Sequence, residues 1–324
     1  MQARVLMGID ENGLGPRLGP LCVTGVTVEV TGDGERTATR APGRSFSRLG
    51  DSKELASYKD SSLGEAWARA ILRRVGRFDA AGSVDDLVHA LSLDDRPALR
   101  APCPEDHHAQ CWRTDDRLVA EEALVDKVSR DLDRLAGKGV QVLDVRSVIL
   151  CSKRLNEHAD RGTSRFDVDL HAMERLVLAA NGAVGREVFA TCGKVGGYDR
   201  YGDAFGPLGG RLHVAIEESR KRSTYRFPTV GELSFVRDAD ATNLLVAMAS
   251  LVGKWLRDAL MARIVRHHRN GDESIPEPSG YHDPVTARFV EATALARRKR
   301  ALPDDCFERR ARDTQQAPSK RARA

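Results

Sequence analysis

Runs of apolar residues alternate with segments of helical periodicity along the whole chain. The first two runs, RVLMGID from Arg4 and PLCVTGVTVEV from Pro20, favour strands, and a segment rich in Gly and Pro joins them. Similar runs predict further strands at VQVLDVRSVIL (140–150), EVFAT (187–191), LHVAIEE (212–218) and 229–237. Strands that alternate with helices predict an α/β sandwich.

Helical periodicity predicts helices over 52–78, 116–135, 171–180, 240–267 and 284–300. The segment that begins at Asp240 is apolar around most of its circumference, which predicts a largely buried helix. Lys254 interrupts this apolar surface, and a charge in such a place needs a partner or a site. Residues 79–116 combine prolines, acids and a Cys/His cluster, and we expect them to be an insertion.

The charge of the chain is uneven. The net charge is +4, but residues 297–324 hold ten Lys or Arg against four acids, a net +6, which leaves −2 for the rest. A basic tail suits a polyanion such as nucleic acid, because each phosphate contact releases counterions; a solvated, disordered terminus is an equal alternative. The chain has neither a run of about 20 apolar residues nor the pattern of a signal peptide, so we expect a cytoplasmic protein.

The six cysteines are scattered through a large chain, which argues against a disulfide framework. Cys103 and Cys111 flank His107 and His108 at close range. A structural zinc site needs four well-spaced ligands, and no second pair follows this cluster, so a surface loop is favoured over a metal site there.

Three short segments carry residues suited to phosphate chemistry. Asp10 and Glu11 end the first predicted strand and run directly into Asn12-Gly13-Leu14-Gly15-Pro16. Asp51-Ser52-Lys53 opens a predicted helix, and Asp240 heads the buried one. Taken singly, each has a plain structural explanation, either a turn or a helix N-cap.

Together, the segments resemble the motifs of the ribonuclease HII (type 2 ribonuclease H) family. The stretch from Gly8 to Leu21 is similar to the family's GIDEAGRGP opening with its following GPL segment, and DSKEL from Asp51 resembles its DSK-x-L element. Asp240-Ala241, followed by Ala249-Ser250, Lys254 and Arg257-Asp258, matches another family segment at the same spacing, and SGYHDP from Ser279 resembles the GSGYPSDP loop. The intervening region, about 79–235, matches poorly.

The resemblance implies a ribonuclease H-like fold over residues 1–300, with a mixed five-stranded sheet flanked by helices, a C-terminal helical extension, and a basic, disordered tail over 301–324. It implies an endonuclease that hydrolyses the RNA strand of RNA–DNA hybrids, using two Mg²⁺ or Mn²⁺ ions held by four carboxylates. The expected partner is RNA–DNA hybrid or duplex DNA containing ribonucleotides, with no membrane and with the protein as a monomer.

The family motifs assign roles to individual residues. Asp10, Glu11 and Asp240 are the implied catalytic and metal-binding acids. The resemblance also implies two sets of substrate-binding residues. Lys53 and Lys254 would bind phosphates. Gly13, Gly15 and Tyr281 would contact the ribose at the DNA–RNA junction, where the 2′-OH distinguishes RNA from DNA.

Two departures from the family pattern weaken the implied activity. Leu14 stands where the family has Arg between its glycines. The third acid should follow the central strand, yet Val188–Gly193 reads VFATCG and has no carboxylate. Asp199, Glu217 or Glu218 are candidate replacements from neighbouring elements. The alternatives are therefore an active or weakly active nuclease, a catalytically impaired hybrid-binding protein of the same fold, and an unrelated structural α/β protein.

Overall fold

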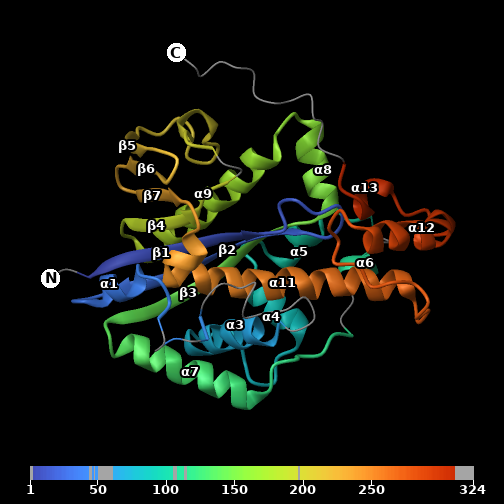
Figure 1. Ribbon diagram of the computed structural model, residues 1–324, viewed down its shortest axis with the longest axis horizontal. Helices are drawn as coiled ribbons and strands as arrows, with labels where there is room; N and C mark the ends of the chain where they lie inside the picture. The colour runs from blue at the N-terminus through green and yellow to red at the C-terminus, as the bar shows by residue number, and fades with distance from the viewer. Residues whose placement is uncertain are drawn as a thin grey trace.

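A computed structural model describes residues 3–43, 46, 48–49, 61–104, 108–112, 115–195 and 198–310 (Figure 1). Among these residues, no helix is both long and apolar enough to cross a membrane. The Asp51-Ser52-Lys53 motif, His107 and residues 311–324 lie outside the described residues.

One seven-stranded mixed sheet forms the centre of the molecule, in the order β3-β2-β1-β4-β7-β6-β5. Strand β1 is antiparallel to β2 and parallel to β4, and β4 is parallel to β7. The strand bounds are β1 Arg4–Asn12, β2 Leu21–Val30, β3 Val140–Leu150, β4 Val188–Gly193, β5 Val214–Glu218, β6 Arg222–Phe227 and β7 Gly231–Val236.

The expectation of a five-stranded sheet is wrong, because the hairpin of β5 and β6 adds two strands beyond β7. The sequence pattern predicts strand β5 but does not predict β6. Arg222 and Arg226 obscure the inward alternation of Ser223, Tyr225 and Phe227, which are all buried. Every residue of β5 is exposed, as befits the outermost strand.

Helices cover both faces of the sheet. Helix α11 (Leu244–Arg269) packs on β1 and β2, with α3 (Ser62–Arg74) and α7 (Glu122–Ala136) behind it, whereas α9 (Arg165–Val184) packs on β1, β2 and β4 (Figure 1). The close approach of α11 needs Gly8, since a Cβ atom there would lie 2.3 Å from the backbone carbonyl carbon of Leu245.

The predicted buried helix is divided in two. Asp240 lies in a short helix, α10 (Ala239–Thr242), and α11 begins afterwards with Asn243 as its N-cap, whose side chain accepts hydrogen bonds from the amides of Leu245 and Val246. The two hydrogen bonds satisfy amides that a helix start leaves unpaired. Asp240 is therefore not the N-cap of the long helix.

The region that we expect to be an insertion contains helices. The region 79–116 includes α4 (Val84–Leu91), α5 (Arg96–Arg100) and α6 (His108–Trp112). Other described helices are spread along the chain: α1 (Gly34–Ala38), α8 (Ser152–Asp160), the short 3₁₀ helix η3 (Gly202–Ala204), α12 (Pro284–Lys299) and α13 (Asp304–Phe307).

The tail boundary at 301 is also wrong. Leu302, Phe307 and Arg309 are buried, and the two apolar side chains join Leu18 and Phe289 in a small core beside the C-terminal half of α11. The packed part of the chain therefore extends at least to residue 310, and only 311–324 remains as a predicted tail.

Candidate active site

Asp10 and Glu11 lie at the end of β1, an inner strand between β2 and β4. Their neighbour on β4 is Gly193, where a Cβ atom would lie 3.4 Å from Oδ1 of Asp10 and 3.7 Å from Oε2 of Glu11. Both distances are ordinary contacts. A side chain at position 193 would therefore project directly between the two acids, and this is the place in the strand where a third carboxylate is missing.

The Asp10 carboxyl is held in an environment that disfavours its charge. Burial raises its pKa well above the usual range, and the charges of Glu11 and Asp240 raise it further, while a hydrogen bond with the Ser250 side chain on α11 opposes the shift. The repulsion from Asp240 is the evidence that α10 brings this acid toward the end of β1. A divalent cation would relieve such repulsion.

Asp169 on α9 is an acid that the sequence analysis missed. It is fully buried, neither of its carboxylate oxygens has a hydrogen-bond partner among the described residues, and burial together with the charge of Asp10 raises its pKa well above the usual range. Burial raises the pKa of the Cys192 thiol, which lies in the core of the α9 face, and the charges of the same two acids raise it further. Asp169 therefore lies behind the end of β1 and β4, close enough to interact with Asp10.

A signal for Asp169 is present in the sequence. Phe166, Asp169, Leu170 and Met173 follow the spacing i, i+3, i+4, i+7, which places the acid on the apolar face of a helix. The predicted helix begins only at His171, because that prediction does not take account of the capping box of Ser164 and Asp167 that opens α9.

The acids that the sequence analysis offers as replacements are held by other side chains. Strand β5, which carries Glu217 and Glu218, is four strands from β1 in the order of the sheet. Glu218 on that strand accepts a hydrogen bond from the Tyr225 hydroxyl at 2.5 Å, and Glu217 accepts one from Ser219. Asp199 is paired with Lys194 at 2.9 Å. Each of the three is thus held by a partner of its own, and among the described residues none of them forms a metal-ligand group with Asp10.

The glycine-rich loop after β1 adopts backbone conformations that require glycine at two positions. Gly13 has φ +95° and Gly19 has φ +83°. A Cβ atom at Gly13 would lie 2.6 Å from Nε of Arg257, whereas nothing in the described structure lies within 4 Å of such an atom at Gly15. The space beside Gly15 is therefore open for a ligand.

The loop that holds Tyr281 packs against this glycine-rich loop. The amides of Arg17 and Leu18 donate to the carbonyl oxygen of Gly280 at 2.8 and 2.9 Å. Tyr281 is half exposed, and the Arg257 guanidinium lies 5.0 Å from the centre of its ring. The structure thus groups Gly13, Gly15 and Tyr281 on one side of the β1 end.

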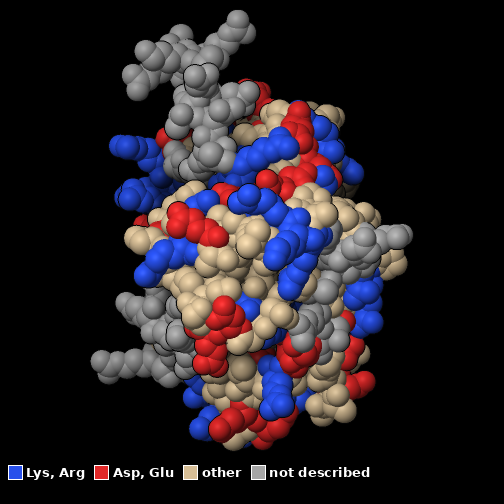
Figure 2. Space-filling view, turned by 90° about the vertical axis from the view of Figure 1, so that its right-hand side faces the viewer, with Lys and Arg blue, Asp and Glu red and all other residues tan. Residues whose placement is uncertain are grey.

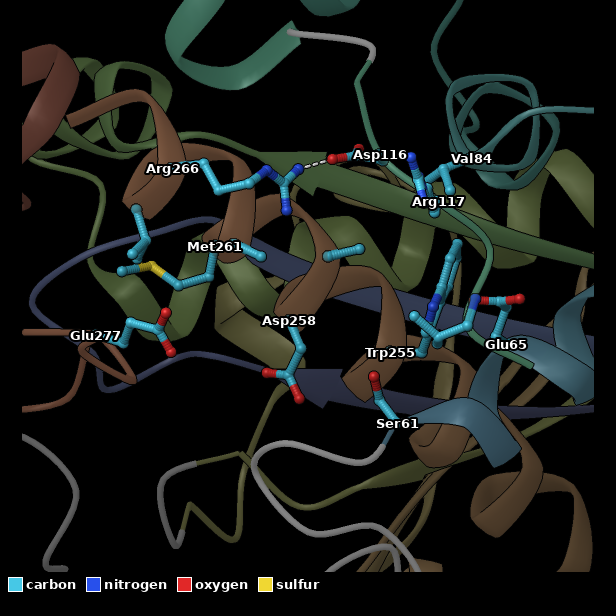
Figure 3. A pocket seen from close by; sticks show the side chains of 14 residues that line it. Ser61, Glu65, Val84, Asp116, Arg117, Trp255, Asp258, Met261, Arg266 and Glu277 are labelled. Atoms are coloured by element: carbon cyan, nitrogen blue, oxygen red, sulfur yellow. Dashed lines mark hydrogen bonds and ion pairs between the residues drawn. The ribbon is translucent and has the colours of Figure 1, made fainter. Parts of the chain in front are cut away.

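Lys254 and Asp258 lie one turn apart on α11. Burial raises the pKa of Asp258 to about 6, and the charges of Arg257 and Lys254 oppose that rise. Figure 3 shows Asp258 and Trp255 projecting into a cavity of about 460 Å³, whose wall includes Glu65 and Asp116. Neither Asp10 nor the other predicted acids line this cavity, so it is separate from the site at the end of β1.

No group of three or more His, Cys, Asp or Glu side chains is arranged to hold a metal ion within the described part of the chain. The described acids at the end of β1 are included in this statement. Cys111, Cys151 and Cys306 line one small cavity, and burial raises the pKa of each thiol. These thiols are therefore protonated at neutral pH.

The outer face at α12 and α13 carries charges of both signs. Figure 2 shows Lys and Arg side chains there interspersed with Asp and Glu. Several of them are paired across elements, such as Lys153 with Asp305 at 2.6 Å and Arg17 with Glu308 at 2.5 Å. A surface of mixed sign gives a phosphate backbone weaker attraction than a uniformly basic one.

Comparison with known proteins gives similarity at the level of structure alone. No family model matches the chain, and no curated protein is similar to it. Among solved structures, it is similar to RNase HII in the PCNA:RNase HII complex from Archaeoglobus fulgidus (TM-score 0.40, 14% identity, 94% of this chain and 93% of that one). It is also similar to ribonuclease H2 from Pyrococcus horikoshii OT3 (TM-score 0.40, 14% identity, 94% and 92%) and to Bst-RNase HIII in complex with Mn²⁺ (TM-score 0.44, 10% identity, 94% and 66%). The chain is an α/β protein with a mixed sheet, and its distant structural neighbours include ribonucleases HII, H2 and HIII.

Proposed function

We propose that this protein is a metal-dependent endonuclease of the type 2 ribonuclease H kind, which hydrolyses the RNA strand of RNA–DNA hybrids. The proposal rests on the motifs around Asp10 and Asp240 and on the grouping of carboxylates at the end of β1. Its substrate would be RNA–DNA hybrid or duplex DNA that contains ribonucleotides.

The observation that carries the proposal is the gathering of carboxylates around Asp10. Burial raises the pKa of Asp10, as do the charges of Glu11 and Asp240, and Asp169 is fully buried with both carboxylate oxygens unpartnered among the described residues. Burying a carboxylate without a partner is costly, so such a cluster is retained where a cation binds or where a proton is needed. Hard divalent ions prefer oxygen ligands.

We assign Asp10, Glu11, Asp169 and Asp240 as the four carboxylates that would hold Mg²⁺ or Mn²⁺. In this assignment, Asp169 replaces the acid that β4 lacks. Because these four described carboxylates are not yet in a ligating arrangement, binding has to draw them together, and this costs affinity. We therefore expect activity to require more metal than a preformed site would, and to favour Mn²⁺, which binds such sites more tightly.

The other residues of the site would bind and orient the substrate. The open space beside Gly15 admits a sugar–phosphate backbone, and Tyr281 is exposed to stack against a ribose. The ammonium groups of Lys254 and Lys53 would each pair with a phosphate, Lys53 from the motif that lies outside the described residues. When bound, the metal ions supply an activated water and stabilise the leaving oxygen.

The second candidate function is a hybrid-binding protein that cuts poorly or not at all. Gly193 favours it, since the strand end that could present a carboxylate between Asp10 and Glu11 presents no side chain. Both functions use the same substrate-binding residues, so only cleavage separates them.

The test is cleavage of an RNA–DNA hybrid over titrations of Mg²⁺ and Mn²⁺, together with hybrid binding in their absence. Asp10→Asn and Asp169→Asn should each abolish cleavage, because an amide is a poor ligand for these ions, whereas Asp203→Asn, at an exposed position, should not. Cleavage that survives both changes would refute the metal assignment. Tight hybrid binding without cleavage in any variant would favour the binding protein.

A further inference from the structure

The C-terminal segment 304–310, which we call the strap, returns across the molecule to the glycine-rich loop near the N-terminus. Leu18 and Glu308 form an antiparallel bridge, and the amide of Arg309 donates to the carbonyl oxygen of Arg17 at 3.0 Å. The Arg17 guanidinium donates to the Glu308 carboxylate at 2.5 Å. The strap thus acts as a short added strand beside the loop.

Arg309 makes the most specific of these contacts. Its Nε donates to the carbonyl oxygen of Gly19 at 2.8 Å, and its Nη1 donates to that of Gly13 at 2.6 Å. One planar guanidinium therefore spans both ends of the loop, at the two glycines whose φ angles are positive. Gly13 is also held from the other side, where a Cβ atom would meet the Arg257 side chain.

Burying the Arg309 guanidinium without a carboxylate partner among the described residues costs folding free energy. Arg309 is 3% exposed, and its Nη2 has no hydrogen-bond partner among the described residues. Burial and the charge of Arg257 lower its pKa to about 9, which still leaves it charged at neutral pH. An apolar side chain could fill the same space with a smaller desolvation cost. What an apolar side chain could not provide is the pair of hydrogen bonds to the two carbonyl oxygens.

The strap is itself anchored to α8. The Asn156 amide nitrogen donates to the carbonyl oxygens of Asp305 and Glu308, both at 2.9 Å, and its amide oxygen accepts from the backbone amide of Arg310. Phe307 is buried in the small core with Leu18. These contacts fix the backbone of the strap, so that Arg309 approaches the loop from a rigid support.

We propose that Arg309 is the positioning residue of the glycine-rich loop, so that this one side chain of the strap supports the substrate-binding loop from behind. This rests on the proposed function in one respect, namely that Gly13 and Gly15 contact the hybrid. Arg309 itself touches no substrate. It sets the conformation in which the loop backbone meets the ribose.

The test compares Arg309→Lys with Arg310→Gln. Lys keeps the charge, but a single ammonium cannot reproduce the two-pronged contact, whereas Arg310 pairs at the surface with Asp160 and serves as the matched control. The first readout is hydrogen–deuterium exchange of the loop amides at 13–19 without substrate. Exchange should rise about tenfold or more in Arg309→Lys, as expected when charge-assisted hydrogen bonds are lost, and should be unchanged in Arg310→Gln.

The second readout separates positioning from general destabilisation. At a temperature where both variants are fully folded, Arg309→Lys should raise KM for the hybrid about tenfold with kcat nearly unchanged. The reason is that the variant loses contacts that bind the substrate and the transition state equally well. If Arg309→Lys does not fold, Arg309→Gln, which keeps a single neutral amide donor group in place of the guanidinium, takes its place in both measurements.

Unchanged exchange at 13–19 in a folded Arg309→Lys protein would overturn the proposal, as would a fall in kcat at constant KM. Failure of the proposed function gives a different result. In that case the wild-type protein neither binds nor cuts hybrid, while the exchange experiment still reports whether Arg309 holds the loop.

Discussion

Asp10 and Gly193 lie side by side at the ends of two parallel strands, with 3.4 Å between Oδ1 of Asp10 and the position of a Cβ atom at residue 193. The φ angle of Gly193 is not in the left-handed region, so an L-residue can be accommodated there. This position, and not Thr191 or Cys192, is where an acid can be added to the site. Cys192 points instead into the core on the α9 face.

Adding an acid at this position should rescue the loss of Asp169. We expect Asp169→Asn to lose cleavage and the double variant Asp169→Asn/Gly193→Asp to regain it in Mn²⁺, measured as hybrid cleavage. Gly193→Asn in the same background adds similar bulk without charge and should not rescue. If both double variants behave alike, the carboxylate count does not control the activity.

The same substitution should make stability depend on metal. Gly193→Asp places a further negative charge beside Asp10 and Glu11, so without metal the unfolding temperature should fall below that of Gly193→Asn. Added Mn²⁺ should recover the difference, because a ligand that binds only the folded state stabilises it. A thermal unfolding series with and without Mn²⁺ measures this, and equal responses of the two variants would contradict it.

Gly15→Ala should damage hybrid binding while leaving the protein itself unaffected. Nothing in the described structure lies within 4 Å of a Cβ atom at this position, so the unfolding free energy should change by less than about 1 kcal/mol. If a sugar–phosphate backbone approaches Gly15 closely, hybrid Kd should rise severalfold. Fluorescence anisotropy with labelled hybrid measures this Kd. An unchanged Kd would show that the substrate does not approach Gly15 closely.

Asp258 should make the protein less stable as the pH rises. Its pKa in the folded protein is about 6, against an ordinary value of 3.8. Between these values the folded state holds a proton that the unfolded state has released, so the free energy of unfolding falls as the pH rises through that window, by up to about 3 kcal/mol at roughly 1.4 kcal/mol per pKa unit. This loss of stability is absent below the lower value and complete above the upper one.

Replacing this acid by Asn should flatten that dependence. Urea unfolding at several pH values between about 4 and 7 should show Asp258→Asn gaining stability relative to wild type as the pH rises. Exposed Asp203→Asn is the control and should track the wild type. Parallel curves for wild type and Asp258→Asn would show that this carboxyl does not titrate in the window.

Two truncations should separate the strap from the terminal residues. Removing 311–324 deletes Arg312, Lys320, Arg321 and Arg323 against the single acid Asp313, so the salt dependence of hybrid binding should become shallower if these residues contact phosphates. Removing 304–324 also deletes buried Phe307, and should cost more than about 3 kcal/mol of stability. Equal stability of the two truncated proteins would show that the strap does not pack in solution.

Local patterns in the sequence predict most of the sheet and the long helices. The runs around Ile9 and Val26 contain enough apolar residues to be predicted as strands from the local sequence alone. The glycines after Asn12 are expected to allow positive φ, and Gly13 has a positive φ. Strand β6 is missed because its two arginines mask its alternation. Asp169 is missed because the predicted start of α9 is too late.

The strap could not be predicted from local pattern at all. Arg309 lies among other basic residues, and in the sequence its position looks like part of a charged terminus. Its role depends on carbonyl oxygens that lie 290 and 296 residues away. Contacts between residues so far apart in the sequence depend on the whole fold. The periodicity of a helix or strand carries no information about them.

The bridge between Leu18 and Glu308 also has a consequence for biosynthesis. The loop at 13–19 leaves the ribosome long before Arg309, which is 290 residues beyond Gly19. A nascent chain can form its sheet early, but it cannot complete the loop until the strap has been synthesised. Contacts between distant parts of a chain form late in folding. Any nascent chain that still lacks residues 304–310 would thus carry the glycine-rich loop without its support.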